Sequence, residues 1–549
     1  MILVGLLIKN GLILDGTGSQ GYISDILIEG DKVVQIKQNI DAAGTEIIDA
    51  SNKVVAPGFI DMHHHGDLSI MEINKAEASI MQGVTTLVVG MCGLGLAPAN
   101  EKVRDYYHNF VKNIFGSSDI LYDTIQEYID VIVKKGVSVN LAFFIPHGNI
   151  RFLVLGIERR PANEREIEEM KKSVEEGMKA GAFGITTGLI YPPGSITSTE
   201  EIIELCKIVA QYKGIYDSHM RNEGGDVIEI GMTELIKIAR EAKVQAQISH
   251  WKAGSSFAWK LTSDMINLVK EAREHGLKIH ADLYPYEESS TSLSYILLQP
   301  WVYDNFKENL TDLEKRKKII NEIFNLISAN FLSSAPKAIG LIPKVILRKF
   351  LLRFFKKSVR IISVTHNHKI EGEFLGPVIK ILYPKRKFVA GLLDFVRDEE
   401  GGIMVSMRMM SEVKSIYSLF KQDFVCVGSD GFLVKDVNTH PRSYGTFPKI
   451  LSKYVREKNI VSLEKAIKKM TYLPATILGL SDRGEIKEDK KADIVIFDFE
   501  KIEDKSTYKN GRQFPEGIDY VIVNGKIAVK KGIHTGALNG QILKHKSDK

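Results

Sequence analysis

The sequence predicts an α/β fold, a TIM-like barrel of eight βα units accompanied by a small β-sandwich domain. Three observations predict it. The chain is 549 residues long, apolar strand-like runs alternate with charged helical patterns through its middle, and short strand-like runs recur at both ends. Because one core usually divides above about 250–300 residues, a barrel with a satellite domain is expected.

Both ends of the chain contain short apolar runs that are separated by turn signals. Near the carboxyl end, Tyr520 to Val523 is followed by Asn524-Gly525, a dipeptide typical of hairpin turns. We therefore expect residues 1–56 and 481–549 to form one small β domain together. The barrel is then expected over residues 57–480.

Eight apolar runs in the middle of the chain are the candidate barrel strands. Between them lie patterns such as Glu164 to Lys179, whose charged residues surround Ile167 and Met170 as in an outer amphipathic helix. The candidate strands are Phe59-Ile60, Thr85 to Val89, Leu141 to Ile145, Phe183 to Thr186, Ile215-Tyr216, Ala246 to Ser249, Ile279 to Leu283 and Val425 to Gly428.

A long insertion separates the seventh candidate strand from the eighth, and its part from about 330 to 395 is atypically basic. Within it, residues 336–357 carry Lys and Arg among Leu, Ile and Phe at roughly helical spacing. The ordinary interpretation is a packed amphipathic helix. A lid, an interfacial helix or a partner-binding helix is the alternative.

Composition limits the partners and the compartment. The 73 basic and 68 acidic residues leave a net charge of only +5, so nucleic acid is not the expected partner. Three cysteines are too few for a disulfide framework, which favours a reducing, cytoplasmic location. No run reaches the roughly 18 uncharged apolar residues that a membrane span needs.

Histidines and a cysteine follow candidate strands, where barrel enzymes place their reactive groups. His63 and His65 are two positions apart, so on an extended strand end both rings face one side and can hold one ion, while His64 points the other way. A single buried histidine is usually structural, but this set predicts a metal centre. Its other members are Cys92, His219 and His250.

Asp430 ends the last candidate strand, within Val427-Gly428-Ser429-Asp430-Gly431. There it could serve as a weak metal ligand and as the acceptor of a proton from a metal-bound water. A helix-capping role is the structural alternative. Cys206 and Cys426 are interpreted as inert core thiols.

The order of these residues resembles the amidohydrolase superfamily. The environment of Cys92, within residues 83–93, resembles more narrowly the N-acyl-D-amino-acid deacylases, or D-aminoacylases. Related hydantoinases and dihydroorotases commonly use a carboxylated lysine, and none occurs in the fourth strand region, 181–189. The resemblance extends to Ser249-His250-Trp251-Lys252, to Asp282-Leu283-Tyr284-Pro285-Tyr286, to residues 440–448 and to Ala492-Asp493-Ile494-Val495.

The resemblance implies a zinc enzyme with the metal-dependent hydrolase barrel. It implies a tight Zn²⁺ site at Cys92, His219 and His250, and a second, weaker position at His63 and His65 with Cys92 and Asp430. One zinc ion can suffice. It further implies that the small-molecule substrate is bound by Tyr191, Lys252, Tyr284, Ser290 and Arg442, where the Arg442 guanidinium suits a carboxylate.

The expected function is zinc-dependent hydrolysis of N-acyl-D-amino acids, with Asp430 as general acid and base. A cyclic amidase of the hydantoinase type and a metal-binding scaffold without catalysis are the alternatives. His366 and His368 also have the two-apart spacing, but they lie in the insertion and are not assigned to the centre. His147, near the third strand end, is a candidate for supporting the metal ligands without binding the metal itself.

Overall fold

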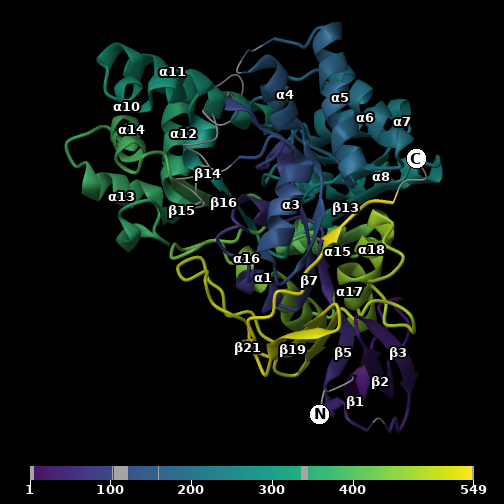
Figure 1. The fold of residues 1–549 in the computed structure, drawn as a ribbon. Helices are drawn as coiled ribbons and strands as arrows, with labels where there is room; N and C mark the ends of the chain where they lie inside the picture. The colour runs from purple at the N-terminus through teal and green to yellow at the C-terminus, as the bar shows by residue number, and fades with distance from the viewer. Residues whose placement is uncertain are drawn as a thin grey trace.

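The computed structural model describes residues 5–41, 43–101, 103, 121–156, 158, 160–334 and 344–546. Figure 1 shows its three parts. Parallel strands and their helices occupy the middle, a sheet of strands from both chain ends lies at the bottom, and helices α10 to α14 gather at the upper left.

Two parallel sheets contain the eight predicted strands, each with its residues largely buried. Their strand orders are β17-β13-β12-β11-β10-β9 and β22-β8-β7-β6. The predicted third strand is divided between β8 and β9. The bounds are β6 (Phe59–Asp61), β7 (Val84–Val89), β8 (Asn140–Phe143), β9 (Ile145–Pro146), β10 (Gly184–Gly188), β11 (Ile215–His219), β12 (Gln245–Ile248), β13 (Ile279–Leu283), β17 (Val425–Val427) and β22 (Ile542–Leu543).

Backbone hydrogen bonds join the two sheets at two places. The Met62 amide donates to the Val427 carbonyl at 3.1 Å, which places the end of β6 beside the end of β17. The Phe183 amide donates to the Phe143 carbonyl at 2.8 Å, which brings β8 beside the start of β10. The carboxyl ends of strands that are far apart in the sequence therefore meet at one edge.

Amphipathic helices connect these strands. The predicted helix is observed as α5, which begins with a capping box between Asn163 and Glu166 and ends at Gly181 in the left-handed conformation. It buries Met170 and Val174 and leaves its charges outside, as expected. The helices of this part are α3 (Ile125–Lys135), α4 (His147–Leu155), α5 (Glu164–Ala180), α6 (Thr199–Gln211), α7 (Thr233–Ala242) and α8 (Thr262–Glu274).

Strands from both chain ends share one nine-stranded sheet. Its order is β21-β20-β19-β18-β5-β1-β2-β3, with β4 beside β1, and the antiparallel pair Val495–Ala56 joins the two ends. Isoleucines such as Ile8, Ile26 and Ile522 form its core. The bounds are β1 (Leu6–Ile13), β2 (Tyr22–Glu29), β3 (Lys32–Lys37), β4 (Glu46–Asp49), β5 (Val54–Pro57), β18 (Ile494–Phe497), β19 (Ile518–Val523), β20 (Lys526–Lys530) and β21 (Ile533–His534).

The chain between β13 and β17 forms a lobe around a three-stranded antiparallel sheet, β14-β16-β15. This lobe has its own apolar cluster, which includes Leu293, Phe355, Leu393 and Val405. Its elements are β14 (Glu288–Ser292), α9 (Leu293–Leu297), α10 (Phe306–Asn309), α11 (Leu313–Ser334), α12 (Lys344–Ser358), β15 (Val359–Val364), α13 (Leu375–Leu382), α14 (Phe388–Asp398) and β16 (Ile403–Arg408).

The helix predicted within 336–357 is observed as α12 over its described part, and residues 336–343 lie outside the described residues. None of the described helices combines the length and the apolar character that crossing a bilayer requires. Shorter helices complete the fold: α1 (Glu77–Ile80), α15 (Tyr417–Phe420), α16 (Arg442–Lys449), α17 (Leu463–Met470) and α18 (Tyr472–Leu478).

Candidate metal centre

The thiol of Cys92 lies at the centre of a buried cluster of imidazoles. Its Sγ is 3.5 Å from Nε2 of His63, 3.6 Å from Nδ1 of His219 and 3.4 Å from Nε2 of His250. All four side chains are buried. The ends of β6, β11 and β12 and the loop after β7 therefore bring the ligand-type atoms of these four side chains together at one point.

A carboxylate completes the cluster on the side of β6. Asp430 Oδ1 lies 3.2 Å from Nε2 of His65 and 3.8 Å from Nε2 of His63. Because His63 faces both Cys92 and Asp430, it connects the two halves of the cluster. The structure thus brings together all six residues that the sequence predicted as metal ligands.

Three of these six residues have unusual backbone conformations. Cys92, His250 and Asp430 have φ of 54°, 34° and 52°, in the left-handed region that residues with a side chain rarely occupy. Such conformations persist only where the surrounding structure holds them, and they concentrate at functional sites. The strand ends are therefore shaped to direct these side chains inward.

Strand β10 holds the Cys92 loop in place. The Gly93 amide donates to Oγ1 of Thr186 at 3.0 Å, and that hydroxyl donates to the Gly90 carbonyl at 2.5 Å. A Cβ on Gly188 would lie 2.3 Å from the Cys92 carbonyl oxygen, so only glycine allows this approach. The strand reads Gly-Ile-Thr-Thr-Gly and contains no lysine, as the sequence indicated.

Glu223 contacts two of the ligand-type histidines on their outer nitrogens, a role that sequence reasoning missed. Its carboxylate lies 3.4 Å from Nε2 of His219 and 3.2 Å from Nδ1 of His250. Nζ of Lys252 donates to both of its oxygens at 2.8 and 2.9 Å. Burial favours a neutral Lys252 amine, but the Glu223 carboxylate outweighs burial and raises its pKa.

Asp282 and Asp61 hold the backbone beneath the cluster. The His250 amide donates to Oδ1 of Asp282 at 2.8 Å, and the same oxygen lies 3.6 Å from Nδ1 of His63. Asp61 accepts from both the amide and the hydroxyl of Ser429, at 2.7 and 2.5 Å. Burial raises the pKa of Asp61 to about 7 even though the Ser429 hydrogen bonds oppose the rise.

His64 faces away from the cluster, as its position in the strand predicted. Its Nε2 lies 3.3 Å from the Ser79 hydroxyl. Burial lowers the pKa of His64 to about 3, so the ring is neutral. It is therefore a structural residue between β6 and α1.

Arg442 and Asp430 form a buried ion pair beside the cluster. The Arg442 NH1 atom lies 2.7 Å from Oδ2 of Asp430, and both side chains are buried. Burial by itself would favour a protonated carboxyl. The Arg442 guanidinium and the nearby imidazoles outweigh burial and hold the pKa of Asp430 well below its usual range.

The residues predicted to bind substrate surround this cluster. The Tyr191 ring lies 5.0 Å from the His219 ring, and the Arg442 guanidinium lies 4.9 Å from the centre of the Tyr284 ring. Arg442 also donates to the Ser290 carbonyl at 3.3 Å. Lys252 lies 2.7 Å from Nδ1 of His250, on the outer side together with Glu223.

Comparison with known proteins finds relatives that match nearly the whole chain. The family model described as "Amidohydrolase family" matches residues 46–130 and 407–529. A D-aminoacylase from Alcaligenes xylosoxydans xylosoxydans is 29% identical over 98% of this chain and 97% of its own length. An N-acyl-D-glutamate deacylase from the same organism is 28% identical over 95% of this chain and 92% of its own.

A solved structure agrees over the whole chain as well. The N-acyl-D-glutamate deacylase from Bordetella bronchiseptica, solved with zinc and a phosphonate inhibitor, has a TM-score of 0.80 and 26% identity, and the match covers 98% of this chain and 99% of that one. Over nearly its whole length, this chain is therefore similar to D-aminoacylases and N-acyl-D-amino-acid deacylases of the amidohydrolase type. Its α/β fold is accordingly the amidohydrolase fold.

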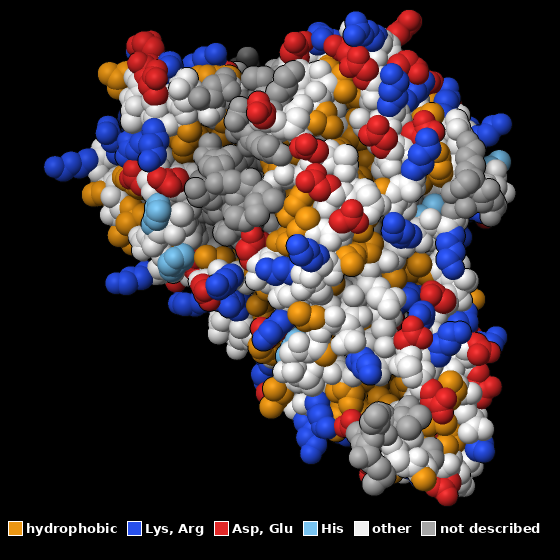
Figure 2. All heavy atoms as spheres, in the orientation of Figure 1, with side chains coloured by type: hydrophobic (Ala, Val, Ile, Leu, Met, Phe, Trp, Pro, Cys, Tyr) orange, Lys and Arg blue, Asp and Glu red, His pale blue; other side chains and the backbone are white. Residues whose placement is uncertain are grey.

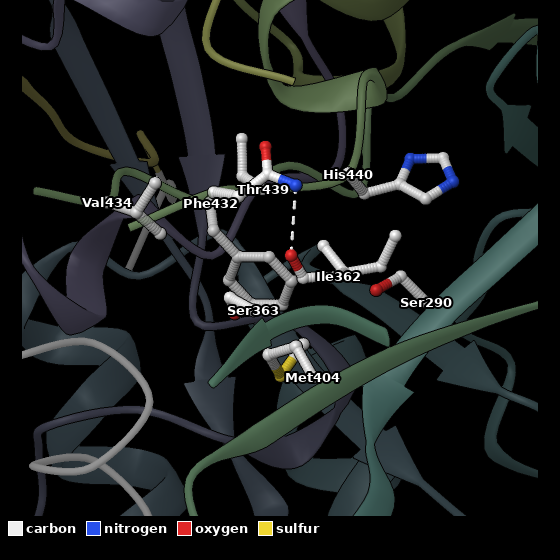
Figure 3. A pocket seen from close by; sticks show the side chains of 9 residues that line it. Ser290, Ile362, Ser363, Met404, Phe432, Val434, Thr439 and His440 are labelled. Atoms are coloured by element: carbon white, nitrogen blue, oxygen red, sulfur yellow. Dashed lines mark hydrogen bonds between the residues drawn. The ribbon is translucent and has the colours of Figure 1, made fainter. Parts of the chain in front are cut away.

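A pocket lies beside Arg442, which donates to the carbonyl of the lining residue Ser290. Figure 3 shows it between the small sheet of the lobe and the loop after β17, with Asn438 donating to the Ile362 carbonyl at 2.9 Å. The lining contains no Lys, Arg, Asp or Glu. It consists of Ser290, Ile362, Ser363, Met404, Phe432, Val434, Asn438, Thr439 and His440.

Several other histidines and cysteines lie outside the cluster. His368 is half-exposed and pairs with Glu371 at 2.9 Å, consistent with its exclusion together with His366. His147 Nε2 lies 3.1 Å from Glu201, which also pairs with Arg151. His147 therefore belongs to a buried ionic group between α4 and α6. Cys206 and Cys426 are buried free thiols.

Proposed function

We propose that this chain hydrolyses the amide bond of N-acyl-D-amino acids at a zinc centre, giving a carboxylate and a free D-amino acid. One observation carries the proposal: a single thiol, Cys92, within 3.4–3.6 Å of three imidazole nitrogens and beside a carboxylate. The relatives that match the chain over nearly its whole length are deacylases of N-acyl-D-amino acids by name.

The donor atoms suit zinc. Thiolate, imidazole and carboxylate are the ligands that zinc takes in proteins. Burial raises the pKa of the Cys92 thiol to about 11, with the His63 charge opposing the rise. A buried thiolate therefore needs a cation, and a bound dication deprotonates a coordinating thiol. Cys92, His219 and His250 would hold the tight ion, and His63, His65, Cys92 and Asp430 a second, weaker one.

Asp430 is the proposed proton carrier. A bound zinc ion would polarise the acyl carbonyl and make water acidic enough to attack near neutral pH. Because Arg442 keeps Asp430 ionised, Asp430 can accept the proton of the attacking water at its Oδ atoms. It would then return that proton to the nitrogen of the leaving amine. Glu223 and Asp282 would hold the imidazoles in the required orientation.

The substrate is proposed to lie between the cluster and the neutral pocket. Arg442 would bind the amino-acid carboxylate as a planar pair of donors, with Tyr191, Tyr284 and Ser290 around it. Lys252 is also proposed to bind the substrate. Because its ammonium group is paired with Glu223 in the structure, Lys252 would exchange this partner for the substrate. The pocket beside Ser290 would take one substituent of the substrate.

The two alternatives are not favoured. A cyclic amidase would be expected to carry a lysine in β10, which has none. A scaffold without catalysis would not need the buried carboxylate of Asp430, kept ionised beside the ligand-type histidines. The relatives that this chain matches over almost their whole length are also enzymes by name.

We further propose that the eight parallel strands close into a TIM-like barrel over residues 57–480. The hydrogen bonds from Met62 to Val427 and from Phe183 to Phe143 support closure, because they link the two sheets at two separate places. Residues 1–56 and 481–549 are proposed as one small β domain, supported by the shared sheet. A cytoplasmic location is proposed from the three free cysteines.

A panel of substrates tests the proposed activity. Amine release should be measured from N-acetyl-D- and N-acetyl-L-amino acids with acidic, apolar and basic side chains, using zinc-loaded protein. We expect release from D-substrates and at least tenfold slower release from their L-enantiomers. Hydrolysis of hydantoins with no release from any acyl-D-amino acid would replace the proposal with the cyclic amidase alternative.

A further inference from the structure

Helix α12 has two apolar faces, of which only one is buried in the lobe. Leu347, Leu351 and Phe355 are 6%, 3% and 8% exposed, and Phe355 is a member of the lobe's apolar cluster. Four-residue spacing places these three side chains on one row along the helix. This row anchors α12 and accounts for the packed amphipathic helix that the sequence predicted.

A second apolar row on α12 is exposed. Ile346, Phe350 and Phe354 have the same four-residue spacing and are 58%, 54% and 49% exposed. Large side chains exposed in a continuous row are uncommon on a helix that serves only to cover a core. The buried row holds α12 against the lobe, while about half of each side chain in the second row is open to a contact outside the lobe.

Basic side chains border the exposed row. Lys349, Arg353 and Lys357 each follow a member of that row by three positions, so they lie on the next row of the helix and are themselves exposed. Within the described part of the chain, no carboxylate forms an ion pair with any of them. Their charge is therefore available to an external anionic surface.

The wider surroundings are basic as well. The sequence contains no acidic residue between Glu322 and Glu371. Helix α13, which packs beside α12, exposes Ile381, and basic side chains project from the loop between α13 and α14 at the left edge of the molecule (Figures 1 and 2). This lobe lies away from the sheet that both chain ends form (Figure 1).

We propose that the exposed face of α12 binds the surface of a membrane that contains anionic lipids. An interfacial helix places apolar side chains among the lipid chains and basic side chains at the headgroups, which is the arrangement of these two rows. A second copy of the chain is disfavoured as the occupant, because it would bring like charges together. The enzyme would then act beside the membrane while its hydrolytic centre remains in water.

Vesicle sedimentation tests the proposal with the full-length, zinc-loaded protein. Vesicles of phosphatidylcholine alone should be compared with vesicles that also contain phosphatidylglycerol. We expect the protein to sediment with the anionic vesicles at low ionic strength and to be released at high salt. Ile346→Ser/Phe350→Ser/Phe354→Ser and Lys349→Glu/Arg353→Glu/Lys357→Glu should each reduce the partition coefficient by about tenfold or more.

Matched controls separate binding from folding. Val133→Ser and Lys135→Glu on α3 change an exposed valine and an exposed lysine elsewhere, and they should leave vesicle binding unchanged. The thermal unfolding midpoint of both α12 variants should equal that of the wild type. Amide hydrolysis of a soluble substrate should also be unchanged, because α12 lies outside the proposed centre.

Three results would overturn the proposal. The first is equal sedimentation of the wild type and both α12 variants with anionic vesicles, or no sedimentation of any of them. The second is binding to polyglutamate but not to vesicles, lost in the charge-reversed variant, which would identify an acidic polypeptide as the partner. The third is a dimer in analytical ultracentrifugation that the Ser variant dissociates, without vesicle binding.

Discussion

At the scale of single residues, Glu223 shows how the proposed centre is built around its ligands. Each of His219 and His250 turns one ring nitrogen toward Cys92 and the other toward Glu223. A carboxylate on the outer nitrogen fixes the orientation and the tautomer of a metal-binding imidazole. One side chain therefore sets the geometry of two ligands at once.

Glu223→Gln should weaken zinc binding by about ten- to a hundredfold, because loss of such a partner has this effect on metal affinity. Competition with a chromophoric chelator measures the affinity. Glu241→Gln, an exposed change on α7, serves as the control and should bind zinc like the wild type. An unchanged affinity in Glu223→Gln would show that the two rings are held by other contacts.

Arg442→Ala should have two effects at the same centre. KM for acyl-amino acids should rise by about tenfold or more, since a charge-assisted contact is lost. The pKa of Asp430 should also rise, because Arg442 holds it low. Asp430 is needed as the carboxylate, so the acid limb of kcat/KM should move to higher pH.

A pH profile of the Arg442→Ala variant measures both effects. A simple N-acyl amine without a carboxylate is the control substrate, and its KM should change little. The assignment of Arg442 to the substrate carboxylate fails if KM for acyl-amino acids stays at the wild-type value. Its assignment as the partner of Asp430 fails if the acid limb does not move.

The ligand-type residues could be predicted from the sequence, whereas their supporting residues could not. His63, His219 and His250 each close an apolar run, and parallel strands present their carboxyl ends at one edge. Glu223 lies in a loop after β11, and only the fold places it against His250. Asp282 lies in a stretch whose sequence resembles the deacylases, but that resemblance did not show its role. Its hydrogen bond to the His250 amide depends on the pairing of β12 with β13.

At the scale of elements, buried strands were predictable and the lobe sheet was not. The eight barrel-type runs are apolar because neighbouring helices cover them. Strand β14, in contrast, reads Glu-Ser-Ser-Thr-Ser and has no apolar alternation. It is extended because β16 pairs with it along its whole length. The pocket beside Ser290 depends on this pairing and therefore could not be predicted.

Strand β22, near the end of the chain, extends the parallel sheet beside β8. Leu543 pairs with Ala142, and its buried side chain packs in a cluster with Phe144 and Phe183. Leu543→Ala should destabilise this contact by about 2–3 kcal/mol, the lower range for a buried leucine. A lower thermal midpoint and faster amide exchange in β8 would show it.

Lys546→Ala is the control for this prediction, because Lys546 is exposed three residues beyond the end of β22. It should unfold like the wild type. Wild-type exchange rates in β8 of the Leu543→Ala variant would mean that β22 does not stabilise the sheet.

At the scale of the whole molecule, segments far apart in the sequence meet to build the centre and its surroundings. The first and last of the eight predicted strands, observed as β6 and β17, place His65 beside Asp430. The lobe between β13 and β17 supplies one wall of the pocket and carries the exposed face of α12. The two chain ends share a sheet below. A metal at the centre would therefore connect strand ends from most of the fold.

Metal removal and replacement test the central claim most directly. The protein should be stripped with a chelator, and amine release from its preferred N-acetyl-D-amino acid should be measured before and after zinc is returned. We predict that the stripped protein loses nearly all hydrolysis, that about one equivalent of zinc restores it, and that zinc raises the thermal unfolding midpoint. Full hydrolysis by protein shown to be free of metal would contradict the account.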